Sequence, residues 1–242
     1  MLKFGLLGGV RIANYAYQGQ GAQWVAYNIG DRPQADKIEI SFKLYIQSHT
    51  QTYRGLIGYC ADFQSNATWT DWQVYIQTDD LLYMSMPNSG GTKSNFVLNE
   101  PLPTGKWLDV SVTYDVNFPA AEVLVSVSGV GSQYHNFDNY QVQGNANRGN
   151  DVRVFGNGVR SWANSLQCYD FNVIVDGENI INIAADEQSG LVSVNTGTGD
   201  DGVINDEAIH QIRWVDTGVI TEPVTFNGST VTFNGEGVTY GN

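Results

Sequence analysis

Strict alternation of apolar and polar side chains is the dominant pattern along the centre of the chain. One run follows Asp36, and another follows the Pro/Gly-rich turn at 101–106. Because successive side chains of a β-strand point to opposite faces, each run predicts a strand with one buried face. The apolar members are Ile38, Ile40, Phe42, Leu44 and Ile46 in the first run and Leu108, Val110, Val112 and Tyr114 in the second.

Shorter apolar runs separated by Gly, Asn and Asp predict further strands. These strands cover 56–60, 72–77, 81–86, 121–129, 152–155, 166–175 and 180–183. Asp176 and Gly177 predict a tight turn before the last of them. Residues 131–150 are predicted to form a polar loop, and the best helix candidate is a short one near 206–209. The pattern predicts an all-β fold.

The chain has 242 residues, with 27 Gly, 13 Tyr and 6 Trp, which suits short strands joined by glycine turns. β-Sandwiches of about 200–250 residues commonly form one domain. We therefore expect one sandwich with appendages. The zones are an N-terminal arm or first strands at 1–35, the sandwich at 36–190, a polar Gly/Asp-rich extension packed on it at 191–223, and a tail of short β repeats at 224–242.

The tail repeats the motif Val-Thr-Phe-Asn-Gly at Val224 and Val231, with a shortened copy at Val238. Asn-Gly accepts positive φ at both turn positions, so each copy can reverse the chain. Such short strands are too small to hold an apolar face alone. The tail is either disordered or docked on its own sandwich, or it interlocks with neighbouring subunits. The residues predicted for oligomer contacts are Phe226, Phe233 and Tyr240.

Two segments resemble known domains. The turn and strand at 103–115, with Trp107 opening the strand and Tyr-Asp closing it, resemble laminin G-like and related concanavalin A-like lectin domains. The run 168–188 is similar to the closing strands of such domains in bacteriophage structural proteins. It reads as strand, Asp-Gly turn, strand and polar linker. Its expected buried residues are Ile174, Val175, Ile180 and Ile183.

The resemblance covers roughly residues 36–190 and implies a two-sheet antiparallel jelly-roll sandwich, here with N- and C-terminal extensions. It also implies binding rather than catalysis. The chain departs from the family at 125–129, where a Tyr-Val-Asp-Gly hairpin is expected and the aspartate is missing. A calcium site is therefore not carried over.

The charge balance argues against nucleic acid as a partner. The chain has 12 Lys and Arg against 25 Asp and Glu, a net charge of −13, whereas phosphate binding needs clustered cations. No run approaches the roughly 20 apolar residues of a membrane span, so membrane insertion is not expected. The short apolar run at 1–10 is interrupted by Arg11 and is interpreted as mature protein, which argues against general secretion.

Known catalytic and metal-binding motifs are absent from the sequence. There is no Glu-x-Asp-x-Glu run of the kind that glucanases of this fold use, and His49, His135 and His210 are widely scattered. The acidic loop at 195–202 matches no calcium motif, so no cofactor is predicted and the question of calcium stays open. Cys60 and Cys168 are either buried free thiols or a disulfide between distant strands.

Three segments combine aromatic rings with polar side chains, as sugar-binding sites do: 62–72, 133–140 and 160–164. Trp72 opens a predicted strand and is assigned to the core. For every other ring, packing is the alternative to ligand binding. The candidate ligand-binding residues are Asn66, Trp69, Tyr134, Asn136 and Trp162.

Two functions are consistent with these features. The first is a non-enzymatic virion structural protein, such as a head decoration, spike or tail-fibre component, whose lectin-like domain binds host-surface polysaccharide. It would be located in the virion and assemble as a homo-oligomer or with other virion proteins. The alternative is a free-standing extracellular carbohydrate-binding protein, for which export and a monomeric body are expected.

Overall fold

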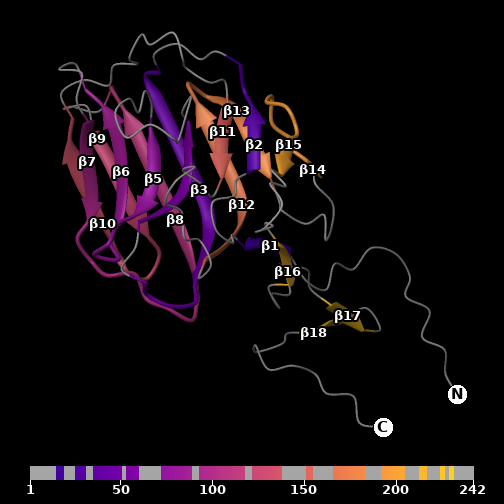
Figure 1. The fold of residues 1–242 in the computed structure, drawn as a ribbon. Coiled ribbons are helices and arrows are strands. Elements are labelled where there is room, and N and C mark those ends of the chain that lie inside the picture. Colours follow the sequence, from indigo (N-terminus) through magenta and orange to yellow (C-terminus); the bar gives the residue numbers. More distant parts are fainter. Residues whose placement is uncertain are drawn as a thin grey trace, which may run out of the picture.

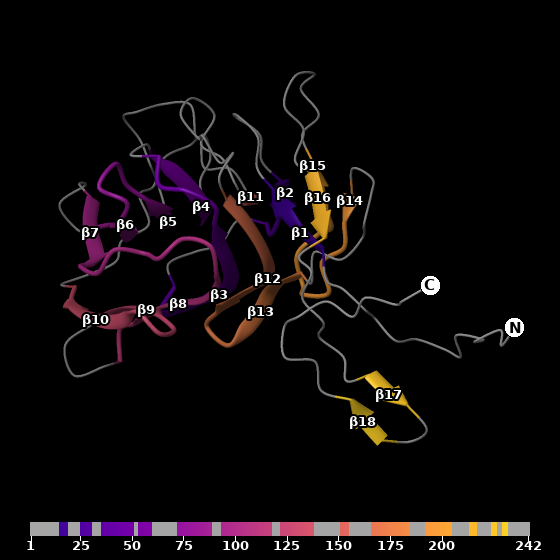
Figure 2. The same ribbon diagram turned by 90° about the horizontal axis from the view of Figure 1, so that it is seen from below.

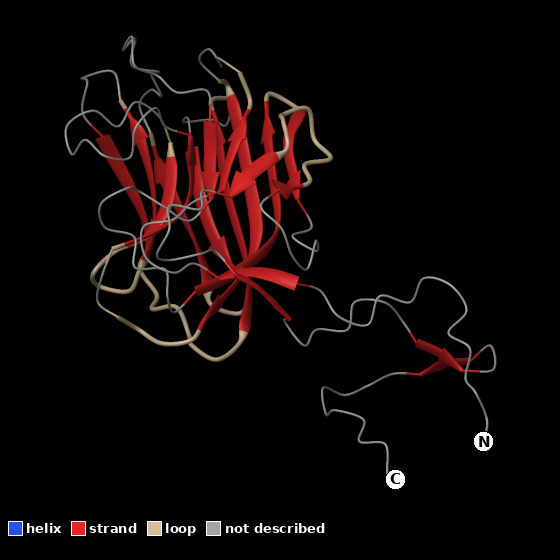
Figure 3. Ribbon diagram, turned by 45° about the vertical axis from the view of Figure 1, so that its right-hand side comes forward, coloured by secondary structure: helices blue, strands red, loops and turns tan. Residues whose placement is uncertain are grey.

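The computed structural model describes residues 15–18, 25–30, 35–50, 53–59, 72–88, 93–117, 122–137, 151–154, 166–183, 192–204, 213–216, 224–226 and 229–231. Every regular element in these ranges is a β-strand (Figure 3). The strands form two large antiparallel sheets, sheet A and sheet B, and one separate hairpin. The predicted all-β, two-sheet antiparallel sandwich is thereby confirmed. No helix in these ranges is long and apolar enough to cross a membrane.

Sheet A has the strand order β10-β9-β8-β3-β12-β1-β16, and β13 pairs with β12 beside this path. The two long strands predicted from alternation, β3 and β8, lie side by side at its centre. The bounds are β1 (Tyr15–Gln18), β3 (Lys37–Ile46), β8 (Trp107–Asp115), β9 (Glu122–Val127), β10 (Gly131–Asn136), β12 (Leu166–Val175), β13 (Glu178–Ile183) and β16 (Arg213–Asp216).

Sheet B has the order β14-β15-β2-β11-β4-β5-β6-β7 and forms the second layer (Figures 1 and 2). Each sheet includes strands that precede residue 36 or follow residue 190. These are β1 and β16 in sheet A, and β2, β14 and β15 in sheet B. The bounds are β2 (Val25–Asn28), β4 (Arg54–Tyr59), β5 (Gln73–Ile76), β6 (Leu82–Pro87), β7 (Lys93–Leu98), β11 (Asp151–Val154), β14 (Val192–Ser193) and β15 (Gly202–Ile204).

The first copy of the tail repeat forms a two-stranded hairpin of β17 (Val224–Phe226) and β18 (Ser229–Val231). Val224 lies opposite Val231, and Phe226 opposite Ser229. Figures 1, 2 and 3 all draw this hairpin away from the two sheets. Phe233 and Tyr240, the other predicted oligomer contacts, lie outside the described residues.

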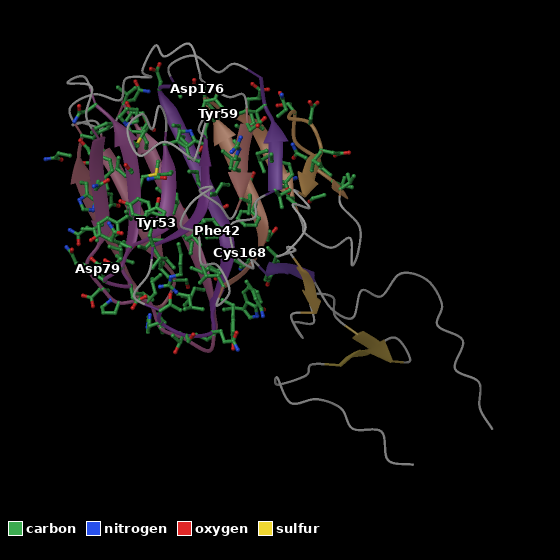
Figure 4. All side chains as sticks on the ribbon, in the orientation of Figure 1. Phe42, Tyr53, Tyr59, Asp79, Cys168 and Asp176 are labelled. Carbon is green, nitrogen blue, oxygen red and sulfur yellow. The ribbon has the colours of Figure 1, made fainter. Side chains whose placement is uncertain are left out.

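The core lies between the sheets, where alternate residues of β3 and β8 are buried as their pattern predicts. Phe42 of β3 stacks on Phe171 of β12 with ring centroids 5.4 Å apart. Cys168 is a fully buried free thiol, and burial raises its pKa well above the ordinary value (Figure 4). The thiol interpretation therefore holds for Cys168, while Cys60 lies outside the described residues. Trp72 is buried, as expected of a core residue.

Strand β12 departs from the expected burial at one position. Val173 and Val175 face the core opposite Ile40 and Ile38 of β3, so Ile174 between them points to the outer face, opposite Glu39. The prediction that Ile174 belongs to the buried face was wrong because side chains alternate along a strand. The prediction for Val175, Ile180 and Ile183 was right, since all three are buried.

The predicted turn between β12 and β13 is confirmed. Asp176 and Gly177 have φ values of 49° and 84°, the left-handed region that an Asp-Gly turn tolerates. The Asp176 carboxylate also accepts hydrogen bonds from the backbone N–H groups of Asp36 and Lys37, at 2.9 and 2.8 Å. These bonds fix the start of β3. Asp176 lies at the opposite end of the sandwich from Asp79 (Figure 4).

Strand β10 occupies the first part of the segment predicted to be a polar loop, so that prediction was wrong for residues 131–136. The tight turn before it contains Gly129 with φ of 71°, and β10 then pairs in register with β9. Its sequence looks like a loop because the inward residues Gly131, Gln133 and His135 are not apolar and are only half-buried. A strand without apolar residues on its inner face lacks the alternation by which strands are predicted.

Residues 195–201 are anchored to β13 through the buried side chain of Asn195. Its oxygen accepts the N–H groups of Asn182 (2.8 Å) and Gly197 (3.0 Å), and its nitrogen donates to the Ile180 carbonyl (3.0 Å). Gly197 packs so closely that a Cβ would lie 2.8 Å from the Ile180 carbonyl carbon. The acidic loop is therefore held by the Asn195 side chain and by the close approach of Gly197 to the backbone of β13.

Candidate functional site

The outer face of sheet A carries a row of side chains that crosses four strands, β3, β8, β9 and β10. Cross-strand register places successive members directly opposite one another, and all of them point away from the core. Neighbouring strands are spaced by about 4.8 Å, so the row is roughly 14 Å long. Its members, which we call the Tyr134 row, are Glu39, Thr113, Leu124 and Tyr134.

Polar rows flank the Tyr134 row on both sides. On one side four serines lie opposite one another, and the hydroxyls of Ser126 and Ser132 are hydrogen-bonded at 2.7 Å. On the other side is a row of charged and amide side chains. The serine row is Ser41, Ser111, Ser126 and Ser132, and the charged row is Lys37, Asp115, Glu122 and Asn136.

The Tyr134 row and the charged row enclose a hollow of about 250 Å³, here named the Tyr134 hollow. Tyr134 is 61% exposed, so most of its ring is open to a ligand. The hollow combines an aromatic ring with a hydroxyl, two carboxylates and an ammonium group. It is lined by Lys37, Glu39, Thr113, Glu122, Leu124 and Tyr134.

The inner face of β10 holds Tyr134 in place. His135 lies with Nε2 2.9 Å from the Val97 carbonyl oxygen of β7, and its ring is 5.6 Å from that of Phe96. Phe137 is buried edge-on against Phe96, with ring centroids 5.0 Å apart. Because alternate residues face opposite sides, these inward contacts direct Tyr134 outward.

The lysines of this face are engaged in ion pairs. The Lys37 ammonium lies 3.0 Å from the Glu39 carboxylate, and each side chain is 38% exposed. Beyond the serine row Lys43 pairs with Asp109, and this hydrogen bond raises the pKa of Lys43 against the opposing effect of burial. Glu122, across the hollow from Lys37 and Glu39, is therefore not matched by either lysine.

The chemistry of the hollow suits a sugar. An exposed aromatic ring offers an apolar platform for the C–H face of a pyranose, while hydroxyls and carboxylates around it bind the sugar's hydroxyl groups. The serine row and the charged row add further polar groups on the two sides of the Tyr134 row.

A second aromatic cluster, here named the tyrosine stack, lies on the outer face of sheet B. Tyr53 and Tyr83 sandwich Tyr75, with ring centroids 4.8 and 5.4 Å from it. Each hydroxyl donates to a side chain: Tyr53 to Gln73 (3.0 Å), Tyr75 to Asn95 (3.3 Å) and Tyr83 to Asp79 (2.6 Å). Figure 4 labels Tyr53 and Asp79 of this region.

Burial and hydrogen bonding raise the pKa values of two tyrosines in the stack. Desolvation is the largest cause that raises the pKa of Tyr75, which is only 3% exposed. For Tyr83 the hydrogen bond to Asp79 comes first and burial second, and together they raise the pKa to about 12. A cluster whose rings stack on each other and whose hydroxyls bind protein groups is part of the packing.

Of the predicted ligand-binding residues, Tyr134 and Asn136 lie two positions apart on the outer face of β10, Tyr134 in the hollow and Asn136 in the adjoining charged row. Asn66, Trp69 and Trp162 lie outside the described residues. Sequence reasoning missed the strand residues of the hollow because it looked for rings in loops. Cross-strand register brings these polar positions together, and one sequence does not reveal it.

No group of three His, Cys, Asp or Glu side chains that could hold a metal ion occurs within the described ranges. In the acidic loop, the Asp201 carboxylate accepts the N–H of Asn195 at 2.9 Å. His49 lies 3.4 Å from the Asp80 carboxylate, which also pairs with the buried Arg54. These acids are thus engaged with protein groups.

No family model matches the sequence, and no curated protein matches it. Among solved structures, a "putative carbohydrate binding protein" from Bacteroides ovatus is similar over 90% of this chain, with 14% identity and a TM-score of 0.59. This chain spans 63% of the length of that protein. The comparison supports the same two-sheet fold, because similarity at such low identity concerns the fold alone.

Two further structures are more distant. A heptameric SAP-like pentraxin from Limulus polyphemus covers 85% of this chain and 98% of its own, with 13% identity and a TM-score of 0.48. Domains LG4-5 of the mouse laminin alpha1 chain cover 74% of this chain and 47% of their own, with 14% identity and a TM-score of 0.46.

Proposed function

We propose that this chain is a non-enzymatic glycan-binding protein and that the Tyr134 hollow, with the serine row beside it, is its binding face. The observation that carries the proposal is the 61% exposure of a tyrosine that borders a hollow with polar side chains. An aromatic ring that stays in water does not gain the free energy that burial of its apolar area would give. A sugar ring stacked on Tyr134 would bury part of that area.

The pairing of Glu39 favours binding over hydrolysis. Glycoside hydrolases use two carboxyl groups, one as general acid and one as nucleophile or base, on either side of the scissile bond. Glu39 lies two strands away from Glu122 and is held in an ion pair with Lys37. These acids are assigned to ligand hydroxyls.

The test is glycan binding by the full chain, measured on a glycan array and then by calorimetry with the best ligand. Tyr134→Ala is expected to weaken binding strongly. Tyr45→Ala is the matched control, because Tyr45 lies on the same face but packs against Trp107, outside the hollow. Binding that survives Tyr134→Ala and fails with Tyr45→Ala would overturn the assignment.

We propose further that the sandwich is displayed on a virion, as a head decoration, spike or tail-fibre component that binds host-surface polysaccharide. The similarity of the run 168–188 to bacteriophage structural proteins supports this context. So does the β17–β18 hairpin, drawn apart from the sheets, because an isolated two-stranded hairpin is marginally stable in water. Other copies of the tail, or other virion proteins, would cover it.

Light scattering separates this proposal from a free-standing extracellular carbohydrate-binding protein. The full chain is expected to be an oligomer, and a chain ending at Glu222 is expected to be a monomer. The full-length triple variant Phe226→Ser, Phe233→Ser and Tyr240→Ser should behave like the shortened chain. Monomers throughout would favour the free-standing alternative.

A further inference from the structure

We infer that the Tyr134 hollow selects its glycan by charge: it takes neutral glycans, binds amino sugars more tightly, and binds glycans that carry carboxylates more weakly. This inference rests on the proposed function, since it assigns a ligand class to the same face. The supporting observation is which of the charged side chains around Tyr134 are paired and which are not.

The lysines of the face are matched and two carboxylates are left over. On the outer face of β3, β8, β9 and β10, Lys37 pairs with Glu39, and Lys43 pairs with Asp109. The remaining charged groups on these four strands are carboxylates only. Asp115 accepts the N–H of Asn117 at 2.8 Å, which leaves its charge in place. The two unmatched acids are Asp115 and Glu122.

Glu122 is positioned to contact a sugar stacked on Tyr134. Leu124 lies directly opposite Tyr134, so Glu122 is its diagonal neighbour across the β9–β10 pair. Diagonal neighbours lie about 7–8 Å apart, within reach of long side chains. A ring substituent pointing toward β9 therefore meets a carboxylate, which favours an ammonium group and disfavours another carboxylate.

The net charge of the chain, −13, acts in the same direction at longer range. At physiological ionic strength the screening length is about 8 Å, so the groups lining the hollow dominate the selectivity. Lys37 would be the natural partner of an anionic sugar, and its pairing with Glu39 competes with that role.

The experiment compares neutral, amino, sialylated and uronic-acid glycans on one array with the full chain. Neutral and amino glycans are expected among the bound set. Binding that is confined to sialylated or uronic-acid glycans would overturn this inference and leave the proposed function standing. Absence of all glycan binding would overturn the proposed function itself.

A matched pair then measures the preference. The N-acetylglucosamine trimer and the glucosamine trimer differ in charge at the amino groups, and we expect the glucosamine trimer to bind about two- to fivefold more tightly, as suits an exposed ion pair. The difference should shrink as salt is added. An equal or reversed affinity would contradict the inference.

The variant Glu122→Gln tests whether the Glu122 carboxylate causes the preference for the glucosamine trimer. It should bring the ratio of the two affinities to about one, whatever the change in the affinity for the N-acetylated trimer itself. Glu100→Gln is the control, because Glu100 is an exposed carboxylate outside the hollow. A preference that persists in Glu122→Gln, or that disappears equally in Glu100→Gln, would overturn the assignment to Glu122.

Discussion

The two outer faces of the sandwich carry the same kinds of side chain in opposite states. On sheet B, Tyr75 lies between two other tyrosines and is 3% exposed, and the hydroxyls of the stack bind protein side chains. On sheet A, Tyr134 is 61% exposed and borders a hollow. Aromatic and polar composition therefore does not identify a binding site. What distinguishes the two faces is whether other side chains of the protein cover the aromatic ring and bind its hydroxyl.

Truncation of the two tyrosines should give the largest contrast. Tyr75→Ala removes a buried ring and is expected to lower the free energy of unfolding by about 3–5 kcal/mol, as for other buried aromatic side chains. Tyr134→Ala should change it by less than about 0.5 kcal/mol, because an exposed side chain packs on little. Urea denaturation measures both values. A similar loss in the two variants would mean that Tyr134 is packing and not a platform.

The next largest effect concerns affinity. Tyr134→Ala should weaken binding of a neutral glycan about tenfold, which corresponds to about 1.4 kcal/mol. Tyr134→Phe keeps the ring and should retain most of the affinity. Calorimetry with the best array ligand measures the two variants side by side. Equal losses in both would assign the contact to the hydroxyl and not to stacking.

A smaller effect is expected when only the hydroxyl of the buried tyrosine is removed. Tyr75→Phe leaves the ring stack intact and loses the hydrogen bond to Asn95, at a cost of about 1 kcal/mol. Double substitution with Asn95→Ala should be less than additive, because the two residues share one interaction. Full additivity would show that the bond contributes nothing to stability.

The smallest effect is a pH dependence confined to the tyrosine stack. Tyr83 has its pKa raised from 10.0 to about 12, first by the hydrogen bond to Asp79 and then by burial. Its folded-state pKa lies above the unfolded value, so its contribution is complete below pH 10 and is lost as the pH rises toward 12. Plots of the free energy of unfolding against pH for the native chain and for Tyr83→Phe should converge in that window. A difference in free energy that stays constant with pH would contradict the raised pKa of Tyr83.

The central strands could be predicted from the sequence because burial on one face imposes a period of two. The alternating runs match β3 and β8. Strand β10 could not be predicted, since its inward residues Gly131, Gln133 and His135 are not apolar and no apolar alternation marks the strand. A strand at the edge of the sheet buries less of its inner face and so does not need the apolar pattern of the central strands.

The candidate site was predictable in part. Tyr134 and Asn136 stand near each other in the sequence, and both were selected for their chemistry. Glu39, Thr113 and Glu122 come from separate strands and meet only through antiparallel register. Register depends on turn geometry and on pairing across the whole sheet, so it is not encoded near any one of these residues.

The first strands of the chain are placed between strands that are synthesised much later. β1 lies between β12 and β16, and β2 between β11 and β15. On a ribosome, residues 15–18 and 25–28 must wait for residues beyond 150 to emerge before they find any partner in the sheets. Their unpaired edges stay open to other chains during that time. Production of this protein should therefore depend on chaperone protection of these early strands more than its final stability would suggest.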